Sequence, residues 1–146
     1  MKLHLNDTFN KELTADAETS NTRRQVFGAC FSYVTPRVPS NPKLLHVTAE
    51  VAELIGLSKE EVTSTEFLEV VSGSKVYPET QPYAMAYAGH QFGNWAGQLG
   101  DGRAINLFEV LQNNQRWALQ LKGAGETPYS RNADGLAVLR SSIREH

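Results

Sequence analysis

The sequence predicts an α+β fold that combines a small antiparallel sheet with several short helices. Two segments with β-branched and aromatic residues, 103–111 and 118–122, flank a polar turn at 112–114, which is typical of a β-hairpin. Apolar residues spaced three and four apart within 48–71 are typical of helices. Eight of the 11 glycines lie in the second half of the chain, where they indicate backbone that turns sharply or approaches a ligand closely.

The first part of the chain divides into a polar lead-in, a strand and a connector. Residues 1–25 are weakly patterned, and we expect them to be loosely held. Residues 26–34, VFGACFSYV, are rich in β-branched and aromatic types and predict a strand. Three prolines within 36–42 predict an extended connector, and 44–47 predicts another short strand. The expected division is thus a lead-in over 1–25, followed by one partial lobe over 26–146.

Helices follow the connector. Thr48 is the expected N-cap of a helix with the sequence AEVAELI, which ends at Gly56. Ser58 and Glu61 have the spacing of a capping box and predict a second short helix. A third apolar stripe at 67–71 predicts further helical packing. Nothing in these helices points to chemistry.

The composition excludes several classes of protein. The chain has 146 residues, 40% of them apolar and 21% charged, as in an ordinary globular domain. The net charge of −2 gives no basic excess for nucleic acid. Cys30 is the single cysteine and forms neither an internal disulfide nor a cysteine zinc site. Because there is no signal-peptide pattern and no apolar run of membrane length, we expect a cytoplasmic protein that contacts no membrane.

A glycine-rich loop precedes the first hairpin strand. It reads Gly97-Gln-Leu-Gly100-Asp-Gly102-Arg103. Such a loop turns backbone N–H groups toward phosphate oxygens, and Arg103 adds a bidentate charged contact. The spacing differs from both the Walker A and the Rossmann fingerprints. A tight turn with a surface arginine explains the same residues without a ligand.

Lys122 ends the second hairpin strand and is followed by another glycine-rich turn. Protein kinases hold their phosphate-binding lysine on such a strand, and a later helix supplies a glutamate that orients it. Glu145 is the candidate for that glutamate, in a final helix predicted over 135–145. Each residue also has an explanation without a ligand. Lys122 can simply end a strand in solvent, and Glu145 can be a solvent-exposed carboxylate.

Asp134 and Gly135 stand at the start of this final helix, after the loop GAGETPYSRNA. A helix cap explains Asp134, and a nucleotide contact is the alternative. The order of features is more informative than each feature alone. The order is a glycine loop, a strand, a turn, a strand with lysine, a loop and a helix with glutamate. The amino-terminal lobe of a kinase has the same order. We therefore expect a kinase N-lobe-like antiparallel sheet, a C-terminal helix equivalent to αC, and additional N-terminal helices.

Two long strings resemble the selenoprotein O family. They are YAGHQFGNWAGQLGDGRA at 87–104 and LKGAGETPYSRNADGLAVLRSSIRE at 121–145, and residues 41–57 resemble the family's upstream segment more loosely. The resemblance implies a kinase-like fold, formerly placed among pseudokinases. It also implies a protein adenylyltransferase, which uses ATP and Mg²⁺ to transfer AMP to Ser, Thr or Tyr hydroxyls of protein substrates. Under this resemblance Glu145 orients the lysine, and the ATP-binding residues are Gly100, Gly102, Arg103, Lys122, Asp134 and Gly135.

The resemblance also implies that part of the catalytic apparatus lies elsewhere. The family's catalytic aspartate, its two metal ligands and two further nucleotide-contacting arginines all lie beyond residue 146. Leu136 stands where the family more often has arginine. We therefore expect an ATP-binding lobe that transfers no AMP by itself, with no catalytic residue and no metal ligand in this chain.

Two alternatives stay open. One is a non-catalytic module that binds a nucleotide or a partner, and the other is a purely structural lobe in which the glycines only make turns. In either case an uncovered cleft face would leave apolar surface exposed, which predicts self-association.

Overall fold

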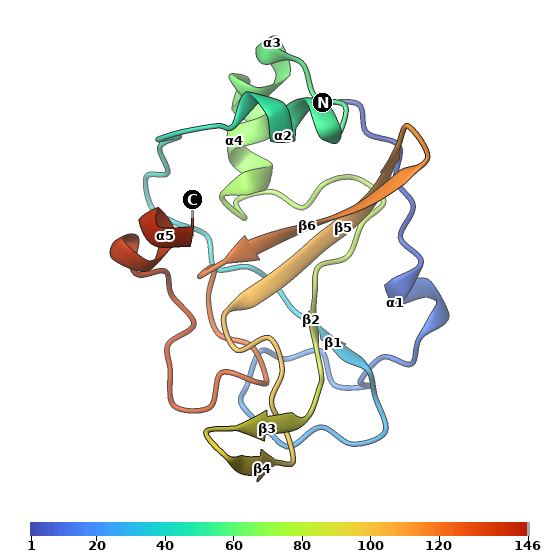
Figure 1. Ribbon diagram of the computed structural model, residues 1–146, viewed down its shortest axis with the longest axis vertical. Helices are drawn as coiled ribbons and strands as arrows, with labels where there is room; N and C mark the ends of the chain where they lie inside the picture. The colour runs from blue at the N-terminus through green and yellow to red at the C-terminus, as the bar shows by residue number, and fades with distance from the viewer. Residues whose placement is uncertain (146) are drawn as a thin grey trace.

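The fold is built on a four-stranded antiparallel sheet (Figure 1). The computed structural model describes the backbone of residues 1–145 and the side chains of residues 1–144. The strand order is β1-β2-β5-β6, and every neighbouring pair is antiparallel. The strands are β1 (Phe31–Tyr33), β2 (Tyr83–Met85), β5 (Ala104–Gln112) and β6 (Gln115–Lys122). Together with the helices, this sheet confirms the α+β class.

The long β5–β6 hairpin was predicted from the sequence, and β6 forms one edge of the sheet. Asn113 and Asn114 connect the strands with φ values of 51° and 60°, as a two-residue type I′ turn requires. A bulge between Asn106 and Phe108 shifts the register. Leu107 is the extra residue, and it is buried with Phe108 and Val110 in the main core.

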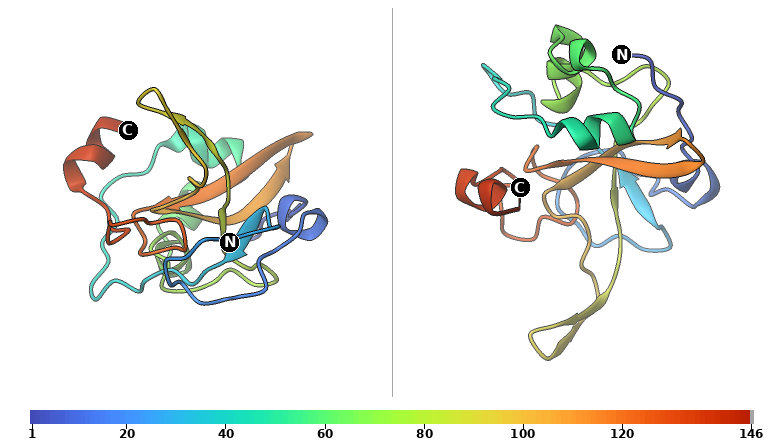
Figure 2. Two further views of the ribbon diagram at one scale, coloured as in Figure 1. Left: turned by 90° about the horizontal axis from the view of Figure 1, so that it is seen from below. Right: turned by 45° about the horizontal axis from the view of Figure 1, so that its top comes forward.

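A second, two-stranded hairpin projects from the body (Figure 2). It consists of β3 (Gly89–Gln91) and β4 (Asn94–Ala96), and its tip is formed by Phe92 and Gly93, both with positive φ. No strand was predicted from the sequence over 89–96. The side chains of this hairpin are mostly exposed, and the Phe92 side chain is 94% exposed, so no buried face gave the alternation that marks a strand.

Three short helices gather at one end of the molecule, opposite the β3–β4 hairpin (Figure 1). They are α2 (Ala49–Leu54), α3 (Lys59–Val62) and α4 (Thr65–Val71); α1 (Phe9–Glu12) and α5 (Leu139–Glu145) lie apart from them. Val70 of α4 joins the core over β5, and the predicted capping box of Ser58 and Glu61 is present. None of the described helices is long and apolar enough to cross a membrane.

Three expectations about where strands and helices lie were wrong. The strand expected over 26–34 covers Phe31–Tyr33. Residues 44–47 belong to no described strand; Leu45 is 83% exposed there, so the segment buries too little to pair with the sheet. Thr48 is the N-cap residue of α2, as expected, but its side chain makes no capping hydrogen bond.

The third wrong expectation concerned the last helix, which begins at Leu139 rather than at residue 135. Gly135 has a φ of 70°, and Leu136 forms a β-bridge with Ala124. Both features are incompatible with a helix, so the chain turns helical only after this bridge.

The first 16 residues are held against the sheet, contrary to the loose lead-in expected from their polarity. The Leu111 N–H donates to the His4 carbonyl at 2.9 Å, and the Asn6 N–H donates to the Glu109 carbonyl at 2.8 Å. Asp7 is buried, and its carboxylate accepts a hydrogen bond from the Glu109 N–H. Backbone pairing of this kind needs no apolar pattern, which explains why the sequence did not show it.

Candidate functional site

The glycine-rich loop packs on Tyr129 so closely that side chains are excluded. Gly100 has a φ of 123°, and a Cβ atom there would lie 2.5 Å from the Tyr129 ring. A Cβ atom on Gly102 would lie 2.9 Å from the Tyr129 carbonyl oxygen. Both glycines are therefore required by local packing, whatever else the loop binds.

Hydroxyl groups from the segment after β6 fix the carbonyl groups of this loop. Thr127 Oγ1 donates to the Asp101 carbonyl at 2.7 Å, and Ser130 Oγ donates to the Gly102 carbonyl. Thr127 and Ser130 are both buried. With its carbonyl groups held on this side, the loop has a defined backbone before any ligand arrives.

A cavity of about 270 Å³ lies between the loop and the β3–β4 hairpin. It brings together Gly100, Gly102 and Arg103, three of the residues predicted to bind ATP. Tyr87 and Gln91 line it from the hairpin side, and Ser130 and Arg131 line it from the segment after β6. Arg131 was not among the predicted site residues, although it lies within the string 121–145 that carries the family resemblance.

Lys122 ends β6 beside the same loop. It pairs with Ala104 in the sheet, and the next residue, Gly123, donates its N–H to the Arg103 carbonyl at 2.6 Å. Strand alternation places Lys122 on the face that also carries Gln120, whose Nε2 donates to Asn106 Oδ1 at 3.1 Å.

Asp101 connects Lys122 electrostatically to the glycine loop. Burial raises the pKa of the Asp101 carboxyl above its usual range. Hydrogen bonds from the Met85 N–H and the Asn106 amide and the charge of Lys122 offset this increase only in part. The charge of Lys122 is thus near enough to act on a buried group of the loop.

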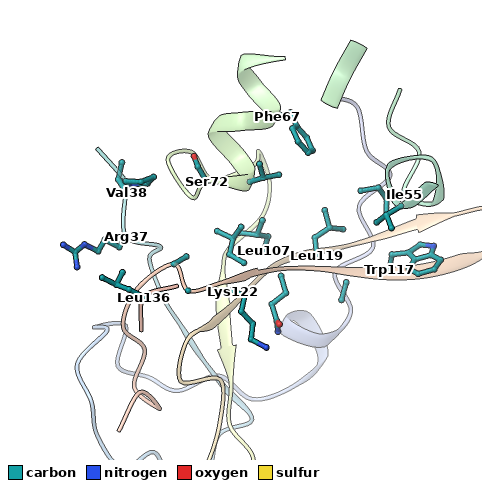
Figure 3. A pocket seen from close by; sticks show the side chains of 18 of the residues that line it. Arg37, Val38, Ile55, Phe67, Ser72, Leu107, Trp117, Leu119, Lys122 and Leu136 are labelled. Atoms are coloured by element: carbon teal, nitrogen blue, oxygen red, sulfur yellow. The ribbon is translucent and has the colours of Figure 1, made fainter. Parts of the chain in front are cut away.

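A larger cavity, of about 950 Å³, lies on the other side of β6, and Lys122 lines this cavity and not the one at the glycine loop (Figure 3). Its lining is mainly apolar and includes Phe67 of α4, Leu107 and Leu119. Figure 3 shows the Lys122 side chain pointing away from Phe67. The lining of this cavity is mainly apolar and includes the cations Arg37 and Lys122, whereas the smaller cavity includes Arg103 and Arg131.

Asp134 and Gly135 do not line the cavity at the glycine loop. Asp134 lies in a polar cavity of about 490 Å³ with Arg23, Arg37 and Glu126, and its carboxylate accepts a hydrogen bond from the Leu136 N–H at 2.9 Å. A Cβ atom on Gly135 would lie 2.0 Å from the Gly125 carbonyl oxygen. Local backbone packing accounts for Gly135.

Glu145 is the last residue of α5, and its side chain lies outside the described residues. Its pairing with Lys122 therefore stays a prediction. Across the residues that the structure describes, no group of three or more His, Cys, Asp or Glu side chains could hold a metal ion.

Comparison with known proteins gives a consistent result. A family model described as protein adenylyltransferase SelO matches residues 16–146. Relatives named protein nucleotidyltransferase YdiU are 67% identical in Flavobacterium johnsoniae (99% of this chain), 56% in Methylobacillus flagellatus (98%) and 56% in Rhodopirellula baltica (98%). The chain spans 28%, 28% and 27% of the length of these three relatives.

Proposed function

Because the chain belongs to the protein adenylyltransferase SelO family, we propose that it is the ATP-binding lobe of an enzyme that transfers AMP to protein hydroxyls. The observation that carries the proposal is the convergence of Gly100, Gly102 and Arg103 on one cavity. Lys122 lines the larger cavity instead, but it pairs with Ala104, the residue after Arg103. The kinase-like arrangement of a sheet followed by a helix is part of the same proposal.

Each residue has a role that follows from its chemistry. The guanidinium of Arg103 presents a planar fork of N–H donors to phosphate oxygens. Lys122 supplies a compact positive charge from a rigid strand, as the phosphate-binding lysine of kinases does. Glu145 orients Lys122, and Asp134 and Gly135 are further nucleotide contacts in this proposal. For the last two, part of the nucleotide would have to extend beyond the 270 Å³ cavity.

The remaining steps of AMP transfer need groups from outside this chain. Nucleotidyl transfer relies on metal ions that neutralise phosphate charge and on a base that takes the proton of the attacking hydroxyl. We propose that Mg²⁺ is held by residues beyond 146, since the chain spans only 28% of the length of the Flavobacterium johnsoniae relative. The protein substrates and a cytoplasmic location belong to the same proposal. The chain alone is expected to bind ATP and transfer no AMP.

One observation favours the structural alternative. Gly100, Gly102 and Gly135 each have a close-packed backbone or ring where a Cβ atom would lie. Their presence is thus explained without a nucleotide, and the proposal depends on the charged residues. A lobe that folds normally and binds no ATP would support the purely structural reading.

Equilibrium dialysis of the chain against labelled ATP with Mg²⁺ tests the proposal. Lys122→Ala removes a charge-assisted contact worth about 1.5–3 kcal/mol, so we expect affinity to fall roughly tenfold or more. Unchanged affinity in Lys122→Ala would contradict the assigned role. Labelled AMP on a protein substrate incubated with this chain alone would contradict the expected lack of transfer.

A further inference from the structure

Arg131 lines the cavity of the glycine loop together with Arg103, and it has not been assigned a role so far. It follows the buried segment Thr127–Ser130, which forms a tight turn: the Ser130 N–H donates to the Thr127 carbonyl at 3.1 Å, and the Ala133 N–H donates to the Ser130 carbonyl at 3.0 Å. The backbone that carries Arg131 is therefore fixed on both sides.

The backbone of Arg131 is itself in an uncommon conformation. Its φ is 55°, in the left-handed region that residues other than glycine, asparagine and aspartate seldom adopt. Such conformations persist where the surrounding structure enforces them, and they gather at functional sites. Here the conformation directs an exposed arginine out of a buried turn and into the lining of a cavity.

One hydrogen bond holds the side chain at the cavity. Arg131 Nη1 donates to Gln91 Oε1 of the projecting hairpin at 2.9 Å. A guanidinium has five N–H donors in a planar fork, so this bond orients the group while using one donor. The charge also reaches across the cavity: burial and Asp101 raise the pKa of Tyr87, and Arg131 opposes that increase.

The cavity thus has two arginines and two glycine backbones around a volume of about 270 Å³. Its nearest buried carboxylate, Asp101, already accepts hydrogen bonds from Met85 and Asn106. Two guanidinium groups at one small cavity suit an anion with several oxygens, because each group offers paired donors to phosphate.

We propose that Arg131 binds a phosphate group of the nucleotide together with Arg103, and that Gln91 orients it. This inference rests on the proposed function, since it assigns a further residue to the same ATP site. The chemistry recognised is a polyphosphate chain, which ATP and free tripolyphosphate share. Adenosine lacks a polyphosphate chain and is therefore the matched control ligand, whose affinity should not depend on Arg131.

The test compares dissociation constants of ATP, tripolyphosphate and adenosine for the wild-type chain, Arg131→Gln, Arg131→Lys and Gln91→Ala. Arg131→Gln keeps a polar side chain of similar length and removes the charge. We expect it to weaken ATP and tripolyphosphate about tenfold, as loss of one charged contact does, and to leave adenosine unchanged. Arg131→Lys should recover part of the affinity. Gln91→Ala should weaken ATP and tripolyphosphate less than Arg131→Gln does, because the guanidinium loses its orienting hydrogen bond but keeps its charge.

The outcomes separate this inference from the proposed function. Wild-type affinity for ATP in Arg131→Gln, with affinity lost in Lys122→Ala, would overturn the inference and leave the proposed function intact. An equal loss in Gln91→Ala and Arg131→Gln would also overturn it, because Arg131 would then act only by holding the hairpin. A wild-type chain that binds neither ATP nor tripolyphosphate would contradict both.

Discussion

Asp16 shows how a single residue connects the first part of the chain to the candidate site. Its carboxylate accepts hydrogen bonds from Arg24 Nε at 3.2 Å and from Ser32 Oγ at 3.0 Å. Ser32 Oγ lies 2.9 Å from the hydroxyl oxygen of Tyr129, whose ring supports Gly100. Burial raises the pKa of Asp16, but hydrogen bonds and the charge of Arg24 outweigh burial and hold it below 3.8.

Replacing Asp16 by Asn should lower the free energy of unfolding at neutral pH by about 1–3 kcal/mol, because a charged acceptor of several hydrogen bonds is lost. A lowered pKa means that the contribution is present above 3.8 and disappears as the pH falls through the folded-state value. Urea unfolding at several pH values should therefore show the wild type and Asp16→Asn converging in acid.

Glu12→Gln is the matched control, since Glu12 is exposed and close in sequence. Its effect on the free energy of unfolding should be small at every pH. A difference between wild type and Asp16→Asn that stays constant down to about pH 3 would contradict the role of the Asp16 charge.

At the scale of elements, the segment Thr127–Ser130 acts as a strap across the glycine loop. Thr127 is fully buried; its hydroxyl donates to the Asp101 carbonyl at 2.7 Å and accepts from the Tyr129 N–H at 3.1 Å. The strap holds the loop before β5 against the segment after β6. The proposed function requires these two segments to keep a fixed relative position.

Thr127→Val keeps the shape of the side chain and removes its hydroxyl. Because a buried carbonyl and a buried N–H would lose their partner, the free energy of unfolding should fall by about 1–3 kcal/mol. Thr127→Ser keeps the hydroxyl and should lose roughly 1 kcal/mol, for one buried methyl group. Equal losses in the two variants, measured by urea unfolding, would show that the hydroxyl does not hold the loop.

Elements with local signals were predictable from the sequence, and elements made by distant contacts were not. The β5–β6 hairpin has its turn residues beside it, and α3 has its capping box, so both were found. The strap was missed because Thr127 and Ser130 act on carbonyl groups 26 and 28 residues away. Asp134 was assigned as a helix cap from its type, whereas the bridge of Leu136 with Ala124 delays α5.

The residues of the candidate site likewise fall into those that were predicted from the sequence and one that was not. Glycines and charged residues within one sequence motif were identified together, and the cavity brings Gly100, Gly102 and Arg103 together. Arg131 belongs to the same cavity, but its place depends on a turn and on Gln91, which is 40 residues away. No spacing rule connects residues of this kind before the fold is known.

At the scale of the whole molecule, apolar surface is left uncovered on the side of α5. A cavity of about 650 Å³ is lined by Leu44, Leu45, Leu139 and Ile143, and all four side chains are at least 40% exposed. The matched relatives are more than three times as long as the region they share with this chain. The apolar lining is the part of the surface that further chain or a second copy would cover.

We therefore expect the isolated chain to self-associate in a concentration-dependent manner in sedimentation velocity. Leu45→Glu should shift the chain toward the monomer, because it places a charge in this lining. Phe27→Glu is the matched control: Phe27 is also 83% exposed and lies outside the cavity. A chain that stays monomeric at high concentration, or equal effects of both variants, would contradict this expectation.

The most direct test of ATP binding is a titration of the ¹⁵N-labelled chain with ATP and Mg²⁺, followed by amide NMR shifts. If the lobe binds ATP, saturable shifts should appear at Gly100, Gly102, Arg103 and Lys122, and they should be lost in Lys122→Ala. A folded sample that shows no shifts at millimolar ATP would contradict the assignment of this lobe as an ATP-binding unit.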